Sequence, residues 1–314
     1  MPRHRLIVIL GPTAVGKTEL SIKLAGQMGT EIISGDSMLV YRGFDIGSAK
    51  PSPDERQGIV HHLIDIREPW ESYNVVDFKE EAERIIAELD DGGKLPILAG
   101  GTGLYVKSLL EGYRFNERAA DEGYRHHLEE LAKLHGREHV HAMLAEADPE
   151  AAARLHVHDL RRVIRALEVA ASGKESISRE KSLEKEGTLV YDAYVIGLRR
   201  ERQRLYERID RRVDLMVSQG LFEETRALLD RGVTVDMQAM QGIGYREAAA
   251  FLEGRMSREE AVQQIKSSTR HFAKRQFTWY RKMPYIHWYD IDDLSGQELF
   301  SLVMGDVEGY FSHA

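Results

Sequence analysis

The chain has 314 residues, of which 42% are hydrophobic and 30% charged, so it can bury one large core or two smaller ones. It contains no cysteine, which excludes disulfides, thiolate zinc sites and thiol nucleophiles. Its net charge of −8 argues against indiscriminate coating of nucleic acid but is compatible with a local basic groove. No apolar run approaches the length of a membrane span, and no signal peptide precedes the first predicted strand, so we expect a cytoplasmic protein.

Residues 11–18 read GPTAVGKT and fit the G-x-x-x-x-G-K-[ST] pattern of a phosphate-binding loop. A predicted buried strand at 5–10 precedes the loop and a predicted helix at 19–28 follows it, as the motif requires. Glycines let the backbone N–H groups turn toward an anion, and the helix N-terminus adds positive potential. Lys17 is expected to reach the terminal phosphate, and Thr18 to hold a magnesium ion. The expected phosphate-binding residues are Gly11, Pro12, Thr13, Ala14, Val15, Gly16, Lys17 and Thr18.

The first third of the chain alternates between strand and helix. Further strands are predicted at 30–37, 62–66 and 95–101, with helices at 75–89 and 102–110. This alternation predicts an α/β fold similar to that of P-loop NTPases, in which helices cover both faces of a parallel sheet.

The pattern changes after about residue 113. Residues 113–189 show helix periodicity and almost no strand signal, so we expect an inserted all-helical domain there and a catalytic core formed by 1–112 and 190–314. The core is expected to resume with a strand at 192–198 and helices at 201–218, 221–231, 244–253 and 257–282. A last strand is expected at 285–291, and the remaining C-terminal segment shows no pattern.

Asp36 follows the second predicted strand. Residues just beyond the carboxyl ends of strands line the ligand crevice of doubly wound sheets, so Asp36 is expected to face the phosphate-binding loop. It is a candidate general base for an accepting group, or alternatively the N-cap of the following turn. The strand at 95–101 ends in glycines rather than an acid, which argues against a nucleotide-hydrolysing motor. A kinase acting on a nucleotide or small molecule remains open.

Three basic clusters stand out. One comprises Arg161, Arg162 and Arg165, and a second lies at 199–212, where acids partly offset it. The third lies within 261–289, which contain no acid. At about 100° per residue, its members Lys266, Arg270, Lys274 and Arg281 share one helix face, and Ile265, Phe272 and Trp279 are expected on the opposite face, against the core. Such a stripe indicates contact with a polyanion, unless acids elsewhere in the fold pair with it.

At this point the chain resembles the bacterial tRNA dimethylallyltransferases, also called tRNA isopentenyltransferases, along essentially its whole length. The resemblance is carried by several motifs together. They are GPTAVGKT at 11–18, DSMLVYRG at 36–43, DIGSAKP at 45–51, HLID at 62–65, GGTGLY at 100–105, RALE at 165–168, GIGY at 242–245 and KRQFTW at 274–279.

The resemblance implies transfer of a dimethylallyl group from dimethylallyl diphosphate to the exocyclic amine of the adenine on the 3′ side of the tRNA anticodon, with release of diphosphate. The loop would then hold the prenyl diphosphate with Mg²⁺, and not the ATP that its motif alone suggests. Asp36 matches the family's general base, Thr102 a position near the adenine, and Arg212 a basic residue near the diphosphate.

The resemblance also implies where tRNA binds. The helical insertion would hold the anticodon stem-loop, and the enzyme is expected to act as a monomer. Expected tRNA contacts are Asp36, Ser37, Met38, Leu39, Thr102, Arg161, Arg162, Arg165, Gln241, Gly242, Gly244, Tyr245, Arg246, Lys274, Arg275, Gln276, Trp279 and Arg281.

Two departures accompany the resemblance. Leu39 stands where the family often has glutamine, and the zinc finger of eukaryotic relatives is absent. Three alternatives are a prenyltransferase acting on free adenine nucleotides, a P-loop kinase, and a non-catalytic RNA-binding protein. An intact phosphate-binding loop together with Asp36 disfavours the last.

Overall fold

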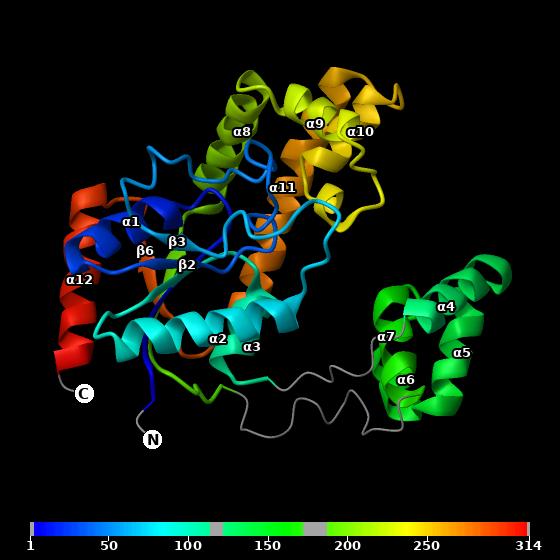
Figure 1. Cartoon of the computed structure of the whole chain (residues 1–314), viewed down its shortest axis with the longest axis horizontal. Coiled ribbons are helices and arrows are strands. Elements are labelled where there is room, and N and C mark those ends of the chain that lie inside the picture. The colour runs from blue at the N-terminus through cyan, green and yellow to red at the C-terminus, as the bar shows by residue number, and fades with distance from the viewer. Residues whose placement is uncertain (1–2, 114–121, 172–186, 313–314) are drawn as a thin grey trace. The chain divides into compact units, whose positions relative to one another are not determined.

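The computed structural model describes residues 3–113, 122–171 and 187–312 (Figure 1). The chain divides into two compact units, one formed by Met1–Leu110 with Leu189–Ala314 and the other by Glu111–Thr188. No helix in the described ranges is long and apolar enough to cross a membrane.

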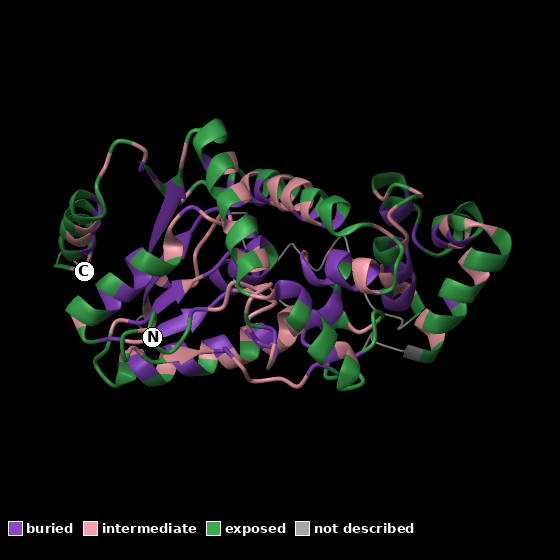
Figure 2. Ribbon diagram, turned by 90° about the horizontal axis from the view of Figure 1, so that it is seen from above, coloured by how far each residue is buried: buried purple, intermediate pink, exposed green. Residues whose placement is uncertain are grey.

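The first unit is built on a six-stranded sheet with the order β3-β2-β4-β1-β5-β6, in which every neighbouring pair is parallel. The strands are β1 (Arg5–Leu10), β2 (Ile32–Ser34), β3 (His61–His62), β4 (Ile97–Ala99), β5 (Asp192–Arg199) and β6 (His287–Asp290). β1 lies in the middle, where Ile7 is level with Ile97 of β4 and Tyr194 of β5. A central parallel strand is buried on both faces, which explains why residues 6–10 of β1 form a continuous apolar run. Figure 2 shows strands of the sheet in the colour of buried residues.

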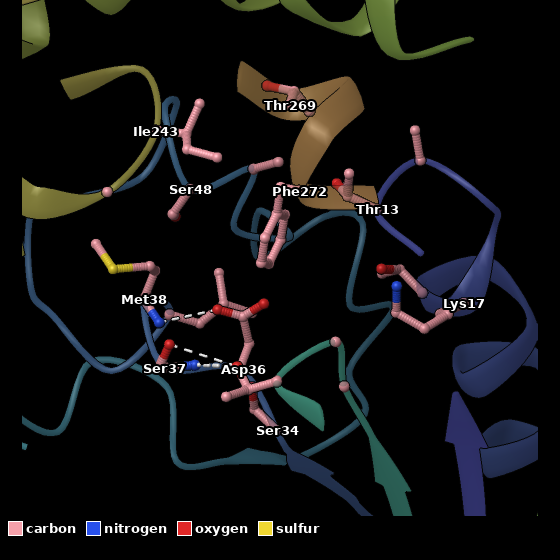
Figure 3. A pocket seen from close by; sticks show the side chains of 18 of the residues that line it. Thr13, Lys17, Ser34, Asp36, Ser37, Met38, Ser48, Ile243, Thr269 and Phe272 are labelled. Carbon is pink, nitrogen blue, oxygen red and sulfur yellow. Dashed lines mark hydrogen bonds between the residues drawn. The ribbon is translucent and has the colours of Figure 1, made fainter. Parts of the chain in front are cut away.

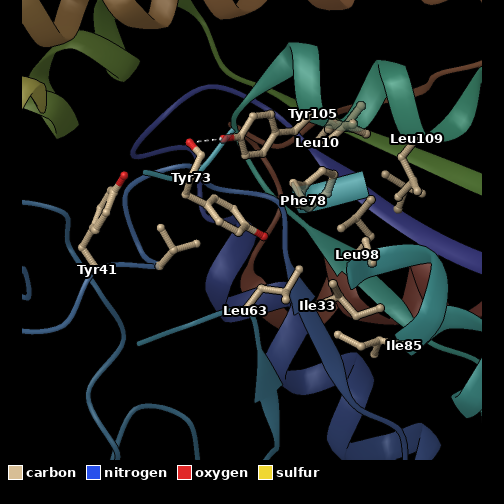
Figure 4. Packing of buried hydrophobic residues seen from close by; sticks show 14 of the residues in the cluster. Leu10, Ile33, Tyr41, Leu63, Tyr73, Phe78, Ile85, Leu98, Tyr105 and Leu109 are labelled. Atoms are coloured by element: carbon tan, nitrogen blue, oxygen red, sulfur yellow. Dashed lines mark hydrogen bonds between the residues drawn. The ribbon is translucent and has the colours of Figure 1, made fainter. Parts of the chain in front are cut away.

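Helices cover both faces of this sheet. Leu6, Val8 and Leu10 point to the face covered by α2 (Val75–Asp91) and α3 (Gly103–Leu110), where Phe78 stacks on Tyr105 (Figures 1 and 4). The side chains between them point to the face covered by α1 (Lys17–Met28) and α12 (Gly296–Ser312). The predicted α/β fold of P-loop type is therefore confirmed.

The remaining helices of this unit follow β5. They are α8 (Arg202–Ser218), α9 (Leu221–Asp230), a 3₁₀ turn at Gln238–Gln241, α10 (Tyr245–Leu252) and α11 (Arg258–Tyr280). α11 starts with a capping box in which Ser257 accepts from the backbone N–H of Glu260 and the Glu260 carboxylate accepts from that of Ser257.

The second unit has its own core. It contains α4 (Glu122–His135), α5 (Arg137–Ala147), α6 (Pro149–Arg154) and α7 (Leu160–Ala171). Leu128, Val140, Leu144 and Val163 are completely buried against one another. Residues 114–121 and 172–186 of the expected insertion lie outside the described residues.

Two expectations about the elements were wrong. The strand expected at 62–66 is only His61–His62, because Leu63 and Asp65 have positive φ values of 62° and 56°, which a strand does not allow. The segment after 291, which shows no pattern in the sequence, contains α12, whose Leu299, Val303 and Val307 are buried at helical spacing. Gly305 and Gly309 on its exposed side obscure that spacing.

Candidate active site

The phosphate-binding loop joins β1 to α1 through residues with positive φ values, two of which are glycines. Gly11 has φ 152°, and a Cβ there would lie 2.8 Å from the carbonyl oxygen of Leu198. Gly16 has φ 118° where α1 begins. Ala14 also has a positive φ of 63°, which is uncommon for a residue with a side chain. The loop thus curls around the N-terminus of α1, as an anion site requires.

Lys17 is the charged group of this loop. Its Nζ donates hydrogen bonds of 2.9 Å to the carbonyl oxygens of Gly11 and Pro12. Burial lowers the pKa of Lys17 to about 8, although the negative charge of Asp36 works against this shift, and the positive charge of Arg212 adds to it. Lys17, Asp36 and Arg212 all line one cavity.

Asp36 and Thr102 come together from different strands. Asp36 follows β2 and accepts a hydrogen bond of 2.8 Å at Oδ1 from the backbone N–H of Met38. Thr102 follows β4, and its Oγ1 accepts a hydrogen bond of 3.1 Å from the backbone N–H of Ser37. The capping alternative for Asp36 is thus real for one carboxylate oxygen, while the residue as a whole faces the same cavity as Lys17.

A cavity of about 390 Å³ connects these groups. Figure 3 shows Lys17, Asp36 and Phe272 around this space. The expected site residues in its wall are Thr13, Ala14, Lys17, Thr18, Asp36, Ser37, Met38, Leu39, Thr102, Arg212, Gln241, Gly242, Arg275 and Gln276. The structure therefore gathers residues that are up to 263 positions apart, from Thr13 to Gln276, at one edge of the sheet.

α11 holds the loop from the other side. Gln276 is 4% exposed, accepts a hydrogen bond of 2.9 Å from the backbone N–H of Thr13 and donates one of 2.8 Å to the carbonyl oxygen of Gly101. The hydroxyl of Tyr280 donates to the carbonyl oxygens of Gly11, at 3.2 Å, and Gly101, at 3.0 Å. Gln276 was expected to contact tRNA, and the structure shows its amide engaged at both ends inside the protein.

Two residues of α11 at this candidate site were not expected there from the sequence. Phe272 was assigned to the core but lines the cavity, and the role of Tyr280 was not foreseen. Phe272, Gln276 and Tyr280 are spaced by four residues and share one face of α11. A glutamine within an otherwise aromatic face is a signal that could have indicated them.

The donor set around the loop fits a magnesium ion. Mg²⁺ takes few protein oxygens and keeps phosphate and water ligands, so it needs no cluster of acids, and the described residues contain no group of three or more His, Cys, Asp or Glu suited to a metal. The Thr18 hydroxyl lines the cavity, and so does Ser34, whose buried Oγ has no partner among the described residues. Such hydroxyl oxygens suit a hard, hydrated cation.

Two of the four basic residues predicted along one face of α11 form ion pairs within the protein. This corrects the expectation of a stripe without opposing acids. Lys266 forms an ion pair of 2.6 Å with Asp214, and Arg270 one of 2.6 Å with Asp210, both on α8. Lys274 and Arg281 are exposed and form no ion pair with any described residue. Trp279 is also wrongly assigned to the core, because it is 40% exposed.

The second basic cluster separates into two groups. Arg199, Arg200 and Arg204 pair with acids at 290–293. Arg200 also donates a hydrogen bond of 3.4 Å to the carbonyl oxygen of Val15 in the loop. Arg208 donates one of 3.0 Å to the carbonyl oxygen of Ala14, and Arg212 lines the cavity. The cluster therefore contacts the loop through Arg200 and Arg208 and the cavity through Arg212.

The remaining expected contacts have mixed surroundings. Tyr245 is completely buried, and its hydroxyl donates to Glu224 at 2.6 Å, whereas Arg246 is exposed. Gly244 is the N-cap residue of α10 and has φ 102°. The first basic cluster lies in the second unit, on α7, where Arg161 and Arg162 are exposed and Arg165 forms an ion pair of 3.2 Å with the buried Glu168.

The sequence is similar to a known family and to named relatives. The model of the family described as IPP transferase matches residues 39–283. The chain belongs to the IPP transferase family. A relative from Bacillus mycoides (strain KBAB4), named tRNA dimethylallyltransferase, is 50% identical over 308 residues, which are 98% of this chain and 95% of the relative.

Solved members of the IPP transferase family share the fold. The full-length tRNA isopentenylpyrophosphate transferase from Bacillus halodurans is 42% identical, with a TM-score of 0.75 over 99% of this chain and 98% of that one. A eukaryotic dimethylallyltransferase acting on tRNA is 29% identical, with a TM-score of 0.84 over 98% of this chain and 80% of that one.

Proposed function

We propose that the protein transfers a dimethylallyl group from dimethylallyl diphosphate to the exocyclic amine of the adenine on the 3′ side of the tRNA anticodon. The observation that carries this proposal is the single cavity shared by Lys17 of the phosphate-binding loop with Asp36 and Thr102. One end of this cavity suits a diphosphate leaving group and the other an amine that must lose a proton. Membership of the IPP transferase family supports the same reaction.

The reaction breaks the bond between the allylic carbon and the diphosphate oxygen and forms a bond from the same carbon to the amine nitrogen. Negative charge develops on the leaving oxygen, where loop N–H groups, Lys17 and Arg212 are suited to stabilise it. A magnesium ion held at Thr18 would add positive charge at the diphosphate. The amine proton passes to the carboxylate of Asp36.

The groups around Asp36 would recognise the adenine. The adenine must leave its stack to reach the allylic carbon inside the cavity. Thr102 lies beside Asp36, where its hydroxyl can bond to the base, while Met38 and Ile243 add apolar surface to the wall (Figure 3). The anticodon stem-loop would contact two parts of the protein. One is the pair of basic residues on α11 that form no ion pair with any described residue, Lys274 and Arg281, and the other is the second unit, which would recognise the shape and phosphates of the RNA.

Mass spectrometry of an anticodon stem-loop incubated with the protein, dimethylallyl diphosphate and Mg²⁺ tests this proposal. We expect a gain of one C5H8 group on the adenine next to the anticodon, with release of one diphosphate. A matched stem-loop with guanine at that position should stay unmodified. Modification of free adenosine monophosphate in preference to the stem-loop, or consumption of ATP in place of the prenyl donor, would contradict it.

A further inference from the structure

Two buried polar atoms in the wall of the cavity have no hydrogen-bond partner in the part of the chain that the structure describes. Ser34 is 4% exposed, and neither its Oγ nor the Nε2 of His61 has a hydrogen-bond partner among the described residues. Both residues line the cavity that contains Thr18 and Asp36. Because a buried polar atom without a partner costs free energy, a ligand that satisfies both atoms is expected there.

The sheet register brings these atoms to one side of the cavity. β2 pairs in parallel with β3 so that Ile32 is level with His61, and Ser34, two residues further along, points to the same face as Ile32. This is the face covered by α1, because Ile32 packs in the cluster that α1 closes. The buried Ser21 and, one turn before it, Thr18 line the same cavity from α1. Figure 3 shows Ser34 at the end of β2, next to Asp36.

The hydrogen-bonding direction of His61 restricts the ligand. Its Nδ1 lies 2.9 Å from the carbonyl oxygen of Ile59, which can only accept, so Nδ1 carries the proton and Nε2 has a lone pair. Burial lowers the pKa of His61, which keeps the ring neutral. Nε2 therefore needs a donor. A phosphate oxygen cannot provide one, whereas a water molecule can.

We propose that Ser34 and His61 bind the hydration shell of the magnesium ion that accompanies the diphosphate, while Thr18 binds that ion directly. This proposal rests on the proposed function. Mg²⁺ dehydrates reluctantly and keeps several water molecules, and these are strong donors that match the lone pair of His61. The Ser34 hydroxyl can donate or accept beside it. Both side chains are positioning residues, since they act on the ion through water.

Calorimetric titration with inorganic diphosphate, with and without Mg²⁺, measures this role. Loss of an outer partner of a metal site typically costs about 10- to 100-fold in metal affinity. Mg²⁺ should raise the diphosphate affinity of the unchanged protein by some factor. In Ser34→Ala and in His61→Leu we expect that factor to be about tenfold smaller, while the affinity without Mg²⁺ stays nearly unchanged. His61→Gln should recover part of it, because its amide oxygen also accepts. His62→Leu is the matched control, since His62 pairs with Glu31 and is not in the cavity wall.

A second measurement separates this role from a merely structural one. With Mn²⁺ and inorganic diphosphate bound, electron–nuclear double resonance on protein labelled with ¹⁵N-histidine should show a weak coupling that His61→Gln removes and His62→Leu keeps. A strong coupling typical of a direct ligand, or none, would overturn the proposal. Thermal unfolding without metal should show Ser34→Ala at or above the midpoint of the unchanged protein, because an unsatisfied hydroxyl has been removed.

The outcomes also distinguish this inference from the proposed function. If Ser34→Ala and His61→Leu keep the full effect of Mg²⁺ while Lys17→Ala abolishes diphosphate binding, only the role of Ser34 and His61 is wrong. If the unchanged protein does not bind diphosphate at all, both the inference and the proposed function fail.

Discussion

The side-chain oxygen of Gln276 accepts a hydrogen bond of 2.9 Å from the backbone N–H of Thr13 and so ties α11 to the phosphate-binding loop. The other end of the same amide donates to the carbonyl oxygen of Gly101, in the turn that carries Thr102. A Cβ at Gly101 would lie 2.5 Å from Gln276 Nε2, so the glycine allows this close approach. One side chain thus sets the spacing between the loop and the turn beside the proposed base.

We expect Gln276→Ala to reduce kcat by about 10- to 100-fold, because a small displacement of reacting groups is costly. The partly buried N–H of Thr13 would lose its partner, which destabilises the protein by about 1 kcal/mol. Steady-state kinetics and chemical unfolding measure the two effects. Gln264→Ala, at an exposed position of the same helix, is the matched control. Unchanged kcat in Gln276→Ala would show that the loop holds its position without this contact.

Lys17 gives the site a pH dependence. Because Lys17 must be charged to attract diphosphate and burial lowers its pKa to about 8, we expect diphosphate affinity to fall as the pH rises through about 8, by up to about tenfold per pH unit. Calorimetry across this range measures it. Lys17→Arg keeps its charge and should show a shallower fall, which separates the protein's titration from that of the ligand. The same slope in both proteins would assign the effect to another group.

The titration of Lys17 also affects stability: a rise in pH that weakens diphosphate binding should make the folded protein more stable. The pKa of Lys17 in the folded protein, about 8, is below its ordinary value of 10.5, so the unfolded chain binds the proton more tightly. Between these pH values the free energy of unfolding should therefore rise with pH, as the cost of burying the charge disappears. Lys17→Met, which has no such charge, should lack this rise in urea unfolding curves. An identical pH dependence in both proteins would contradict it.

The phosphate-binding loop and the sheet could be predicted from the sequence, because both depend on residues that are neighbours in the chain. The GPTAVGKT segment and the alternation of strand and helix predict the loop and the sheet correctly. The residues that α11 contacts could not be predicted in this way. Lys266 and Arg270 looked unopposed because Asp214 and Asp210, their partners, lie on another helix more than fifty residues away. Gln276 and Tyr280 likewise act on backbone atoms that no spacing rule connects to them.

Asp36→Asn tests the base without disturbing the turn. The amide oxygen can still accept from the N–H of Met38, so the loop after β2 should keep its shape. The amide cannot accept the proton of the attacking amine, and we expect single-turnover rates to fall on the order of 100-fold or more while tRNA affinity stays nearly constant. Asp36→Ala should lose the same rate and also destabilise the turn. An Asp36→Asn protein with unaltered turnover would remove Asp36 as the base.

The two halves of the α11 stripe should behave differently toward tRNA. Lys274 and Arg281 are free to contact phosphates, so we expect Lys274→Ala and Arg281→Ala each to weaken binding and reduce the slope of log affinity against log salt by about 1. Arg270 is already paired with Asp210, so Arg270→Ala should leave that slope almost unchanged and instead cost about 0.2–1 kcal/mol of stability.

Fluorescence titrations with an anticodon stem-loop at several salt concentrations measure these slopes, and unfolding curves measure the stabilities. Arg270→Ala serves as the matched control, because it removes one positive charge from the same helix face. If all three variants lower the salt slope equally, the general charge of α11 attracts the RNA, and the pairing seen with α8 does not select which residues bind it.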